Sequence, residues 1–434
     1  MSICRRAFAG FAFAATTHAQ TPTGIAVVDS ASVARLAWSR AAAALRDRNV
    51  DQSRAEVDHA ATAWPTQPAY LWASATLAAR AGDTTRLHDK LAALAALGLG
   101  RDMRRDSTFA SYANAPAISS LVAVLSALAA SDAHSRVRAT LPDSTFWPEG
   151  VDYDSRTRRF YVASVRHRTV AELIPGKPPR ELWPRDRADM GAVYGVRIDT
   201  GRGVLWATMS APRRIAGEAA GDSTIAALIR VRLRDGVIER RWDIASPGPH
   251  TLGDLAVGPT GDVFVTDSDQ PVVYRLRAGR DTLERVTHPL FRSLQGIAPR
   301  PDGRVVYVAD YSHGILRVDL ATSAVERLED APHSTSLGCD GIVWDRGAII
   351  AVQNGVSPAR IMRFVLDSSG RHIVSADVLD RNSAIADEPT IGTIAGGEFV
   401  YVANSQWEKF TESGTHKADR QLTSPILLAV PLPQ

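Results

Sequence analysis

The sequence has 434 residues and a formal net charge of +3, with 45% hydrophobic and 22% charged residues. This composition is that of a soluble globular protein long enough for two or three domains. The small net charge and the dispersed basic residues give no support to nucleic-acid binding. Two cysteines, Cys4 and Cys339, are too few for a disulfide framework.

The first twenty residues resemble an export signal. Arg5 and Arg6 precede a short apolar stretch, and Thr17-His18-Ala19 offers a small-residue cleavage site. No later stretch has the ~18 uncharged apolar residues that a membrane span requires. We expect residues 1–20 to be removed as a signal peptide and the mature protein to be periplasmic or secreted. The alternative is the frayed N-terminus of a cytosolic protein.

Residues 30–131 are rich in alanine and leucine and carry the helical period. The pattern and its Pro and Gly punctuation predict four helices, over residues 33–46, 51–64, 68–81 and 84–97. The second pair looks like a tetratricopeptide unit, and residues 106–118 resemble the tail that closes such arrays. A helical bundle of no repeat family is the open alternative.

After residue 145 one sequence motif occurs six times. Each copy has the first residues of a strand, a turn, and a second strand that ends in a small or polar residue. The six openings are Glu149-Gly150, Tyr194-Gly195, Gly253-Asp254, Gln295-Gly296, Asp340-Gly341 and Thr390-Ile391-Gly392. Repeats of about 40–60 residues with several short strands each are typical of a β-propeller. The predicted fold is mainly β, a six-bladed propeller preceded by a small all-α domain.

The last repeat lacks an outer strand because the sequence stops at Gln434. A third strand follows the motif in every repeat, and a fourth, outer strand follows in the first five. A closed ring does not leave a sheet edge bare without cost. Residues 135–141 alternate like an outer strand, so we predict that they complete the last blade and close a propeller spanning residues 135–434.

The opening residue of each innermost strand faces one mouth of a propeller's axial channel. The matched positions are Glu149, Tyr194, Gly253, Gln295, Asp340 and Thr390. Two carboxylates and an amide oxygen on one axis form a hard oxygen site that suits Ca²⁺. The alternative is that the two acids bond to backbone around a water-filled channel.

Residues 140–434 resemble the SMP-30/gluconolactonase/LRE family, six-bladed propellers that hydrolyse lactones or related esters with a divalent cation in the channel. The resemblance rests on Pro148-Glu149-Gly150, Leu252-Gly253-Asp254-Leu255, Leu294-Gln295-Gly296-Ile297 and Cys339-Asp340-Gly341-Ile342. It implies that Glu149, Gln295 and Asp340 are metal ligands. It also implies that Asp340 is the general base that activates a water molecule.

The sequence departs from the family pattern at two of these positions. Gln295 stands where the family has asparagine, so its acyl oxygen lies one methylene further out. Gly253 replaces a second asparagine and supplies no side-chain oxygen. We therefore expect a weaker Ca²⁺ site than the family's.

Several other residues near the predicted mouth are candidates for substrate binding. They are Tyr194, Asp254, His250, His333 and Glu388. His250 and His333 precede channel strands, although a loop histidine is more often a surface or capping residue. Asp267, Asp310 and Asn404, which end second strands, are interpreted as caps of their turns.

Two function classes remain open from the sequence. The first is an exported, Ca²⁺-assisted hydrolase of lactone or ester bonds, favoured by Glu149 and Asp340. The second is a non-catalytic propeller, similar to the NHL type, that binds a ligand or protein, with helical repeats that bind a peptide. The second class is favoured by Gly253 and by the added helical domain.

Overall fold

A computed structural model describes residues 30–185, 187–211, 225–411 and 415–433. The predicted signal peptide, residues 1–20, lies outside the described residues. The chain divides into two compact units. One contains the residues up to Ala130 with Pro332–Thr335 and Val356–Pro358, and the other contains the rest. In the part of the chain that the structure describes, no helix is both long and apolar enough to cross a membrane.

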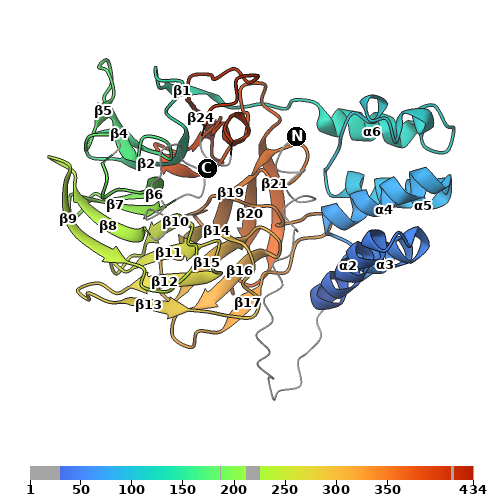
Figure 1. Cartoon of the computed structure of the whole chain (residues 1–434), viewed down its shortest axis with the longest axis horizontal. Coiled ribbons are helices and arrows are strands. Elements are labelled where there is room, and N and C mark those ends of the chain that lie inside the picture. The colour runs from blue at the N-terminus through green and yellow to red at the C-terminus, as the bar shows by residue number, and fades with distance from the viewer. Residues whose placement is uncertain (1–29, 186, 212–224, 412–414, 434) are drawn as a thin grey trace. The chain divides into compact units, whose positions relative to one another are not determined.

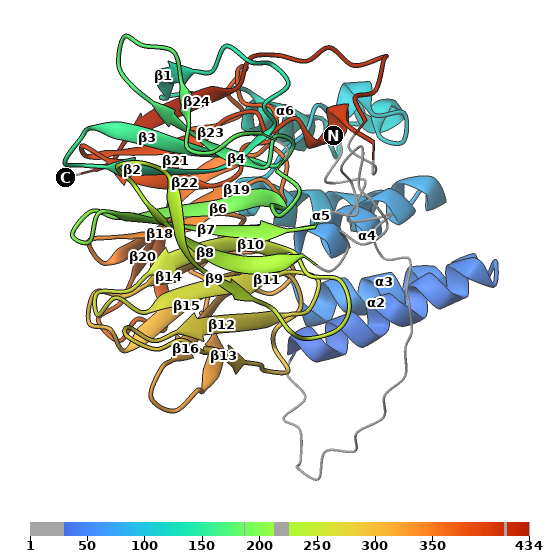
Figure 2. The same cartoon turned by 60° about the vertical axis from the view of Figure 1, so that its left-hand side comes forward.

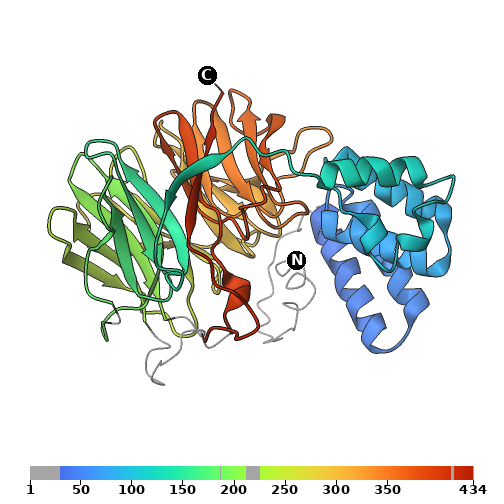
Figure 3. The same ribbon diagram turned by 90° about the horizontal axis from the view of Figure 1, so that it is seen from above.

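The first unit is helical, and its first four helices lie where the sequence predicts them (Figures 1 and 3). The helices are α2 (Ser30–Arg46), α3 (Val50–Ala63), α4 (Pro68–Ala81), α5 (Thr84–Ala96) and α6 (Ser119–Ala129), with 3₁₀ turns η1 (Met103–Arg105) and η2 (Ala110–Tyr112) between α5 and α6. Gly82 ends α4 in the left-handed conformation, with φ 70°. Helix α6 was not predicted. The tetratricopeptide resemblance stays a prediction.

The described residues of the second unit form six four-stranded antiparallel sheets, the blades of a propeller (Figures 1 and 2). Blade 1 holds β2 (Pro148–Asp154), β3 (Arg159–Ser164), β4 (Thr169–Leu173) and β5 (Arg180–Glu181). Blade 2 holds β6 (Ala192–Asp199), β7 (Val204–Ser210), β8 (Ala226–Arg232) and β9 (Val237–Asp243). Blade 3 holds β10 (Leu252–Val257), β11 (Val263–Asp267), β12 (Val272–Leu276) and β13 (Leu283–Val286).

The remaining blades complete the ring. Blade 4 holds β14 (Leu294–Pro299), β15 (Val305–Asp310), β16 (Gly314–Asp319) and β17 (Val325–Arg327). Blade 5 holds β18 (Ile342–Asp345), β19 (Ala348–Gln353), β20 (Arg360–Leu366) and β21 (Ile373–Arg381). Blade 6 holds β22 (Gly392–Ala395), β23 (Glu398–Val402), β24 (Ile426–Pro431) and β1 (Arg136–Thr140). Each innermost strand contacts the next and β22 contacts β2, which confirms the predicted six-bladed fold.

Strand β1 lies at the outer edge of blade 6, antiparallel to β24 (Figure 2). The buried carboxylate of Asp380, at the end of β21, holds the chain that enters β1. Its oxygens accept hydrogen bonds from the backbone N–H groups of His134 (2.6 Å) and Ser135 (3.1 Å), and from the hydroxyls of Ser135 (2.8 Å) and Tyr401 (2.7 Å). Asp380 therefore joins the β1 entry to blades 5 and 6.

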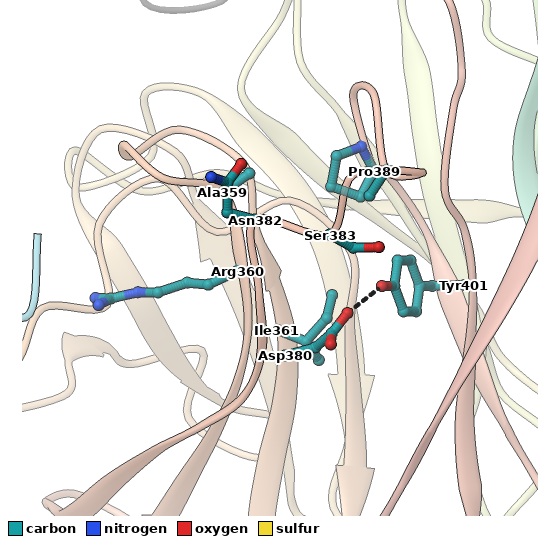
Figure 4. A pocket seen from close by; sticks show the side chains of 9 residues that line it. Ala359, Arg360, Ile361, Asp380, Asn382, Ser383, Pro389 and Tyr401 are labelled. Carbon is teal, nitrogen blue, oxygen red and sulfur yellow. Dashed lines mark hydrogen bonds between the residues drawn. The ribbon is translucent and has the colours of Figure 1, made fainter. Parts of the chain in front are cut away.

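Figure 4 shows Asp380 and Tyr401 pointing toward one another beside a small pocket between β20 and β23. The pocket is lined by Ala359, Arg360, Ile361, Asp380, Asn382, Ser383, Ala386, Pro389 and Tyr401. Because both oxygens of Asp380 already accept hydrogen bonds, its carboxylate belongs to the framework of the fold.

The hydrogen-bond pairing of the innermost strands is interrupted at the opening residues, which are the predicted channel residues. In blades 1 to 4 the pairing of the inner strand shifts register at its opening, for example between Pro148 and Val151. Such β-bulges re-aim side chains next to functional sites. A Cβ on Gly150 would lie 2.3 Å from the carbonyl oxygen of Tyr194, and one on Gly296 would lie 2.5 Å from that of Asp340. The repeated glycine therefore lets neighbouring blades approach closely.

Removing the charge of Asp380 tests its role in ring closure. Asp380→Asn replaces one accepting oxygen by an NH₂ group that faces donors, so we expect a loss of about 1–3 kcal/mol in the free energy of unfolding. Chemical denaturation measures it. The control is Asp377→Asn on the same strand, whose half-exposed carboxylate pairs with Arg363 at 3.3 Å and contributes less than about 1 kcal/mol. Equal effects of the two substitutions would contradict the role given to Asp380.

Candidate functional site in the propeller channel

The candidate site is built from opening residues of the innermost strands. Glu149 lies in the bulge of β2, and Asp340 stands two residues before the start of β18. The backbone N–H of Asp340 donates to the carbonyl of Val352 at 2.8 Å, and the N–H of Val352 donates to that of Gly341 at 2.9 Å. Asp340 therefore extends the pairing of β18 with β19, so its backbone is fixed on the rigid part of the blade.

Glu149 is held by one neutral donor. The indole Nε1–H of Trp407 donates to its Oε2 at 2.7 Å. Burial raises the pKa of Glu149 well above its usual value, and the charge of Asp340 raises it further. The charges of Glu388 and Asp254 act in the same direction, whereas the Trp407 hydrogen bond opposes them. These four acids thus form one electrostatically coupled group.

Asp340 is held in a similar way. The side-chain amide of Asn354 donates to its Oδ2 at 2.7 Å. Burial raises the pKa of Asp340 to about 7, with the Asn354 hydrogen bond opposing and the charge of Asp254 adding to the shift. Burial therefore favours the protonated form of the Asp340 carboxyl.

The two acids differ from Asp254, which stands one residue after the opening of its blade. Asp254 is buried and forms an ion pair with Arg197 at 3.2 Å. Among the described residues, neither Glu149 nor Asp340 has an Arg, Lys or His partner within ion-pair distance. Glu149 and Asp340 are half-buried, and a carboxylate that loses hydration without gaining a counter-charge favours taking up a proton or binding a cation.

Of the other predicted residues, Gln295, Tyr194 and Glu388 also lie at blade openings or beside them. The side-chain amide of Gln295 lies 3.5 Å from the hydroxyl of Ser293. Tyr194 is buried and its ring stacks on that of Trp407, with centroids 6.3 Å apart.

Glu388 is coupled to Glu149 by its charge, although only one of its carboxylate oxygens is hydrogen-bonded. Its Oε2 accepts from the backbone N–H of Glu408 at 3.2 Å. Its Oε1 is buried with no hydrogen-bond partner among the described residues. Burial raises the pKa of Glu388 to about 7.

Neither predicted histidine forms a hydrogen bond or an ion pair with Glu149 or Asp340 among the described residues, and the prediction that they bind substrate stays a prediction. His250 is buried, its Nδ1 lies 2.5 Å from the carboxylate of Asp267, and its Nε2 lies 2.9 Å from the carbonyl of Ser246. Both ring nitrogens thus have structural partners. His333 is exposed and belongs to a segment that groups with the helical unit.

The residues interpreted as turn caps do act as caps. Asp310 accepts from the backbone N–H groups of Arg292 (2.7 Å) and Ser312 (3.0 Å). The side chain of Asn404 accepts from the N–H of Ile426 at 2.7 Å and donates to the carbonyl of Ser424 at 3.0 Å. Asp267 accepts from the N–H groups of three following or facing residues, Thr251, Asp269 and Gln270.

Three partners of the site were missed by the sequence analysis, namely Trp407, Asn354 and Arg197. Trp407 stands in the loop from 406 to 424, which has no readable motif. Asn354 comes after the second strand of blade 5, and Asn404 comes after the second strand of blade 6, where it is a cap. The position of Asn354 in the sequence therefore indicated a structural role.

An aromatic cluster surrounds Trp407 next to Glu149. Trp147 stacks face to face on Phe410, with centroids 4.3 Å apart, and meets Trp407 edge to face at 4.8 Å. Trp147 has φ 49°, a left-handed conformation that is unusual for so bulky a residue. Such backbone strain concentrates at functional sites. The packing holds Trp407 in place to bond Glu149.

The donor chemistry of the site fits a hard cation. Its atoms are carboxylate and amide oxygens, which are preferred by Ca²⁺ and Mg²⁺. No three His, Cys, Asp or Glu side chains within the described ranges gather closely enough to hold a metal ion by themselves. Any ion here would therefore need neutral oxygens as well. Burial raises the pKa of the Cys339 thiol, so the thiol is uncharged at neutral pH.

Comparisons with known proteins were made for the sequence and for the structure. No family model and no curated protein matches the sequence. Among solved structures, virginiamycin B lyase from Staphylococcus aureus is similar at 12% identity and a TM-score of 0.47, covering 69% of this chain and 99% of its own. A gluconolactonase from Xanthomonas campestris has 17% identity and a TM-score of 0.44, covering 71% and 93%. The aldose sugar dehydrogenase of Streptomyces coelicolor has 12% identity and a TM-score of 0.45, covering 68% and 97%. We draw no functional argument from these similarities.

The raised pKa of Asp340 predicts how stability depends on pH. Because the folded state binds the proton more tightly than the unfolded state, chelator-treated protein loses stability as pH rises from about 4 to about 7. Asp340→Asn keeps an acceptor for Asn354 and does not titrate. We expect the variant to gain stability relative to the wild type across this window, with denaturation midpoints at about pH 5 and about pH 8 measuring the difference. A constant difference would show that Asp340 is not perturbed.

Proposed function

We propose that the propeller is an exported hydrolase of lactone or ester bonds that uses a divalent cation, Ca²⁺ in the first place, at its channel. The observation that carries the proposal is the pair Glu149 and Asp340. Both are coupled carboxylates at strand openings, each is oriented by one neutral donor, and neither has a cationic side chain beside it in the described residues. The resemblance of their motifs to those of gluconolactonases supports the same reading.

The cation would supply the charge that these acids lack. When bound, it would polarise the substrate carbonyl and lower the pKa of a neighbouring water. A positive charge beside Asp340 also lowers that residue's pKa, so its carboxylate would be ionised at neutral pH and able to accept a proton.

Residues of the chain would orient the water, transfer its proton and position the ion. Asn354 holds Oδ2 of Asp340, which leaves Oδ1 to take a proton from the attacking water. The water oxygen bonds to the acyl carbon and the bond to the alcohol oxygen breaks. The proton on Asp340 then passes to that oxygen. Trp407 fixes the direction of Glu149, which together with Gln295 would orient the ion.

Calorimetric titration of chelator-treated protein with Ca²⁺ is the first test. We expect binding with a Kd of about 10⁻⁶–10⁻⁴ M, loss of that binding in Asp340→Ala, and hydrolysis of aliphatic lactones or esters that needs the same ion. The control is Asp281→Asn, which removes an exposed carboxylate of blade 3. A wild type that binds no divalent cation would contradict the proposal and favour a non-catalytic binding propeller.

Restoring an amide at position 253 is a gain-of-function test of the same site. A Cβ on Gly253 would meet only the hydroxyl of Ser268, at 3.6 Å, and the backbone there needs no glycine conformation. Gly253→Asn is therefore expected to fold and to tighten Ca²⁺ binding about tenfold, which is about 1.4 kcal/mol. Gly253→Ala, which adds the carbon without the oxygen, serves as control. Equal affinity in the two variants would place residue 253 outside the site.

A further inference from the structure

A cation site at Glu149 and Asp340 would have too few protein ligands if these two carboxylates were its main ones. Ca²⁺ binds about 6–8 oxygens. No third acid joins these two closely enough to form a metal cluster in the described part of the chain, and Gly253 offers no side chain. Water can fill some positions, but a site of useful affinity needs further protein oxygens.

Asn354 carries such an oxygen. Its side chain is 7% exposed and touches the site directly, because its Nδ2 donates to Oδ2 of Asp340 at 2.7 Å. The same nitrogen donates to the carbonyl of Pro389 at 2.8 Å. Its Oδ1 is buried and has no hydrogen-bond partner within the described ranges.

The orientation of this amide is determined by its neighbours. The carbonyl of Pro389 can only accept a hydrogen bond, so the amide nitrogen must face it whether or not Asp340 is protonated. Turning the amide over would set Oδ1 against two acceptors. The unpartnered atom is therefore the oxygen.

An oxygen buried without a donor is uncommon in folded proteins, and a bound ion is one of the arrangements that satisfies it. Oε1 of Glu388, the residue before Pro389, is a second buried oxygen without a partner in the described part of the chain. Oxygens without donors are suited to bind a cation.

We propose that Asn354 is a ligand of the channel cation through Oδ1, in addition to being a hydrogen-bond donor to Asp340. This inference rests on the proposed cation dependence. Asn354 would supply from blade 5 the neutral amide oxygen that Gly253 does not supply from blade 3. The side chain would then have two functions, because one end orients a carboxylate ligand and the other end binds the ion.

Terbium luminescence tests the ligand role without any assay of activity. Tb³⁺ replaces Ca²⁺ in oxygen sites, the indole of Trp407 beside Glu149 sensitises its emission, and decay times in H₂O and D₂O count the waters on the ion. Asn354→Leu is expected to lower the affinity at least about tenfold and to add about one water, since one protein oxygen is lost. Asn354→Asp keeps an oxygen but loses the N–H donor, so its water count should equal that of the wild type.

The outcomes separate the inference from the proposal on which it rests. If Asn354 only orients Asp340, both variants bind more weakly and neither gains a water, which overturns the ligand role while the cation site stands. If the wild type binds no Tb³⁺ or Ca²⁺, the cation dependence fails and the ligand role fails with it. Thermal unfolding checks each variant, and Asn354→Ala, which also lacks a side-chain oxygen, replaces Asn354→Leu if the leucine variant does not fold.

Discussion

The close approach of neighbouring blades around the channel is the constraint on which the candidate site depends. A Cβ at Gly150, Gly296 or Gly341 would lie within 2.7 Å of backbone atoms of the next blade. Glycine therefore follows the opening residue in several repeats, and the backbone N–H of Gly296 donates across to the carbonyl of Asp340 at 3.0 Å. The same crowding gives the opening residues rigid backbones, as a preorganised site requires.

The rigid ring then creates an electrostatic problem, because it buries carboxylates where the chain provides few counter-charges. Elsewhere the fold solves this problem with arginine. Glu172 bonds to Arg159 and Arg180, and Asp254 pairs with Arg197. Among the described residues, the side-chain donors to Glu149 and Asp340 are instead an indole and an amide. Paired and unpaired acids thus lie within one channel, and the unpaired ones remain available to a ligand.

How far the sequence predicts this molecule depends on whether a feature is local. Period-two patterns and turn residues lie within a few residues of each strand, so all six blades follow from them. The role of residues 135–141 follows from a missing edge strand. The partner of Glu149 lies far away in sequence, since Trp407 bonds it across 258 residues, whereas Asn354 follows Asp340 by 14 residues. The strongly apolar helix α6 (Ser119–Ala129) also escaped prediction. Local pattern gave no signal that His250 would bond to Asp267.

Asp254 has an arginine partner, whereas Glu149 and Asp340 have none among the described residues. This difference bears on the function of the channel. Desolvating an acid without a counter-charge opposes folding, and a buried Arg partner removes much of that cost, as at Asp254. A fold selected only for stability would place arginine or an apolar residue beside Glu149 and Asp340 as well. The chain instead positions neutral donors on one oxygen of each acid, strains Trp147 to support one of those donors, and leaves Oδ1 of Asn354 without a partner within the described residues. The missing counter-charges, the strained Trp147 and the unpartnered Oδ1 oppose stability at the same place, which is the pattern expected where a site is held ready for a ligand.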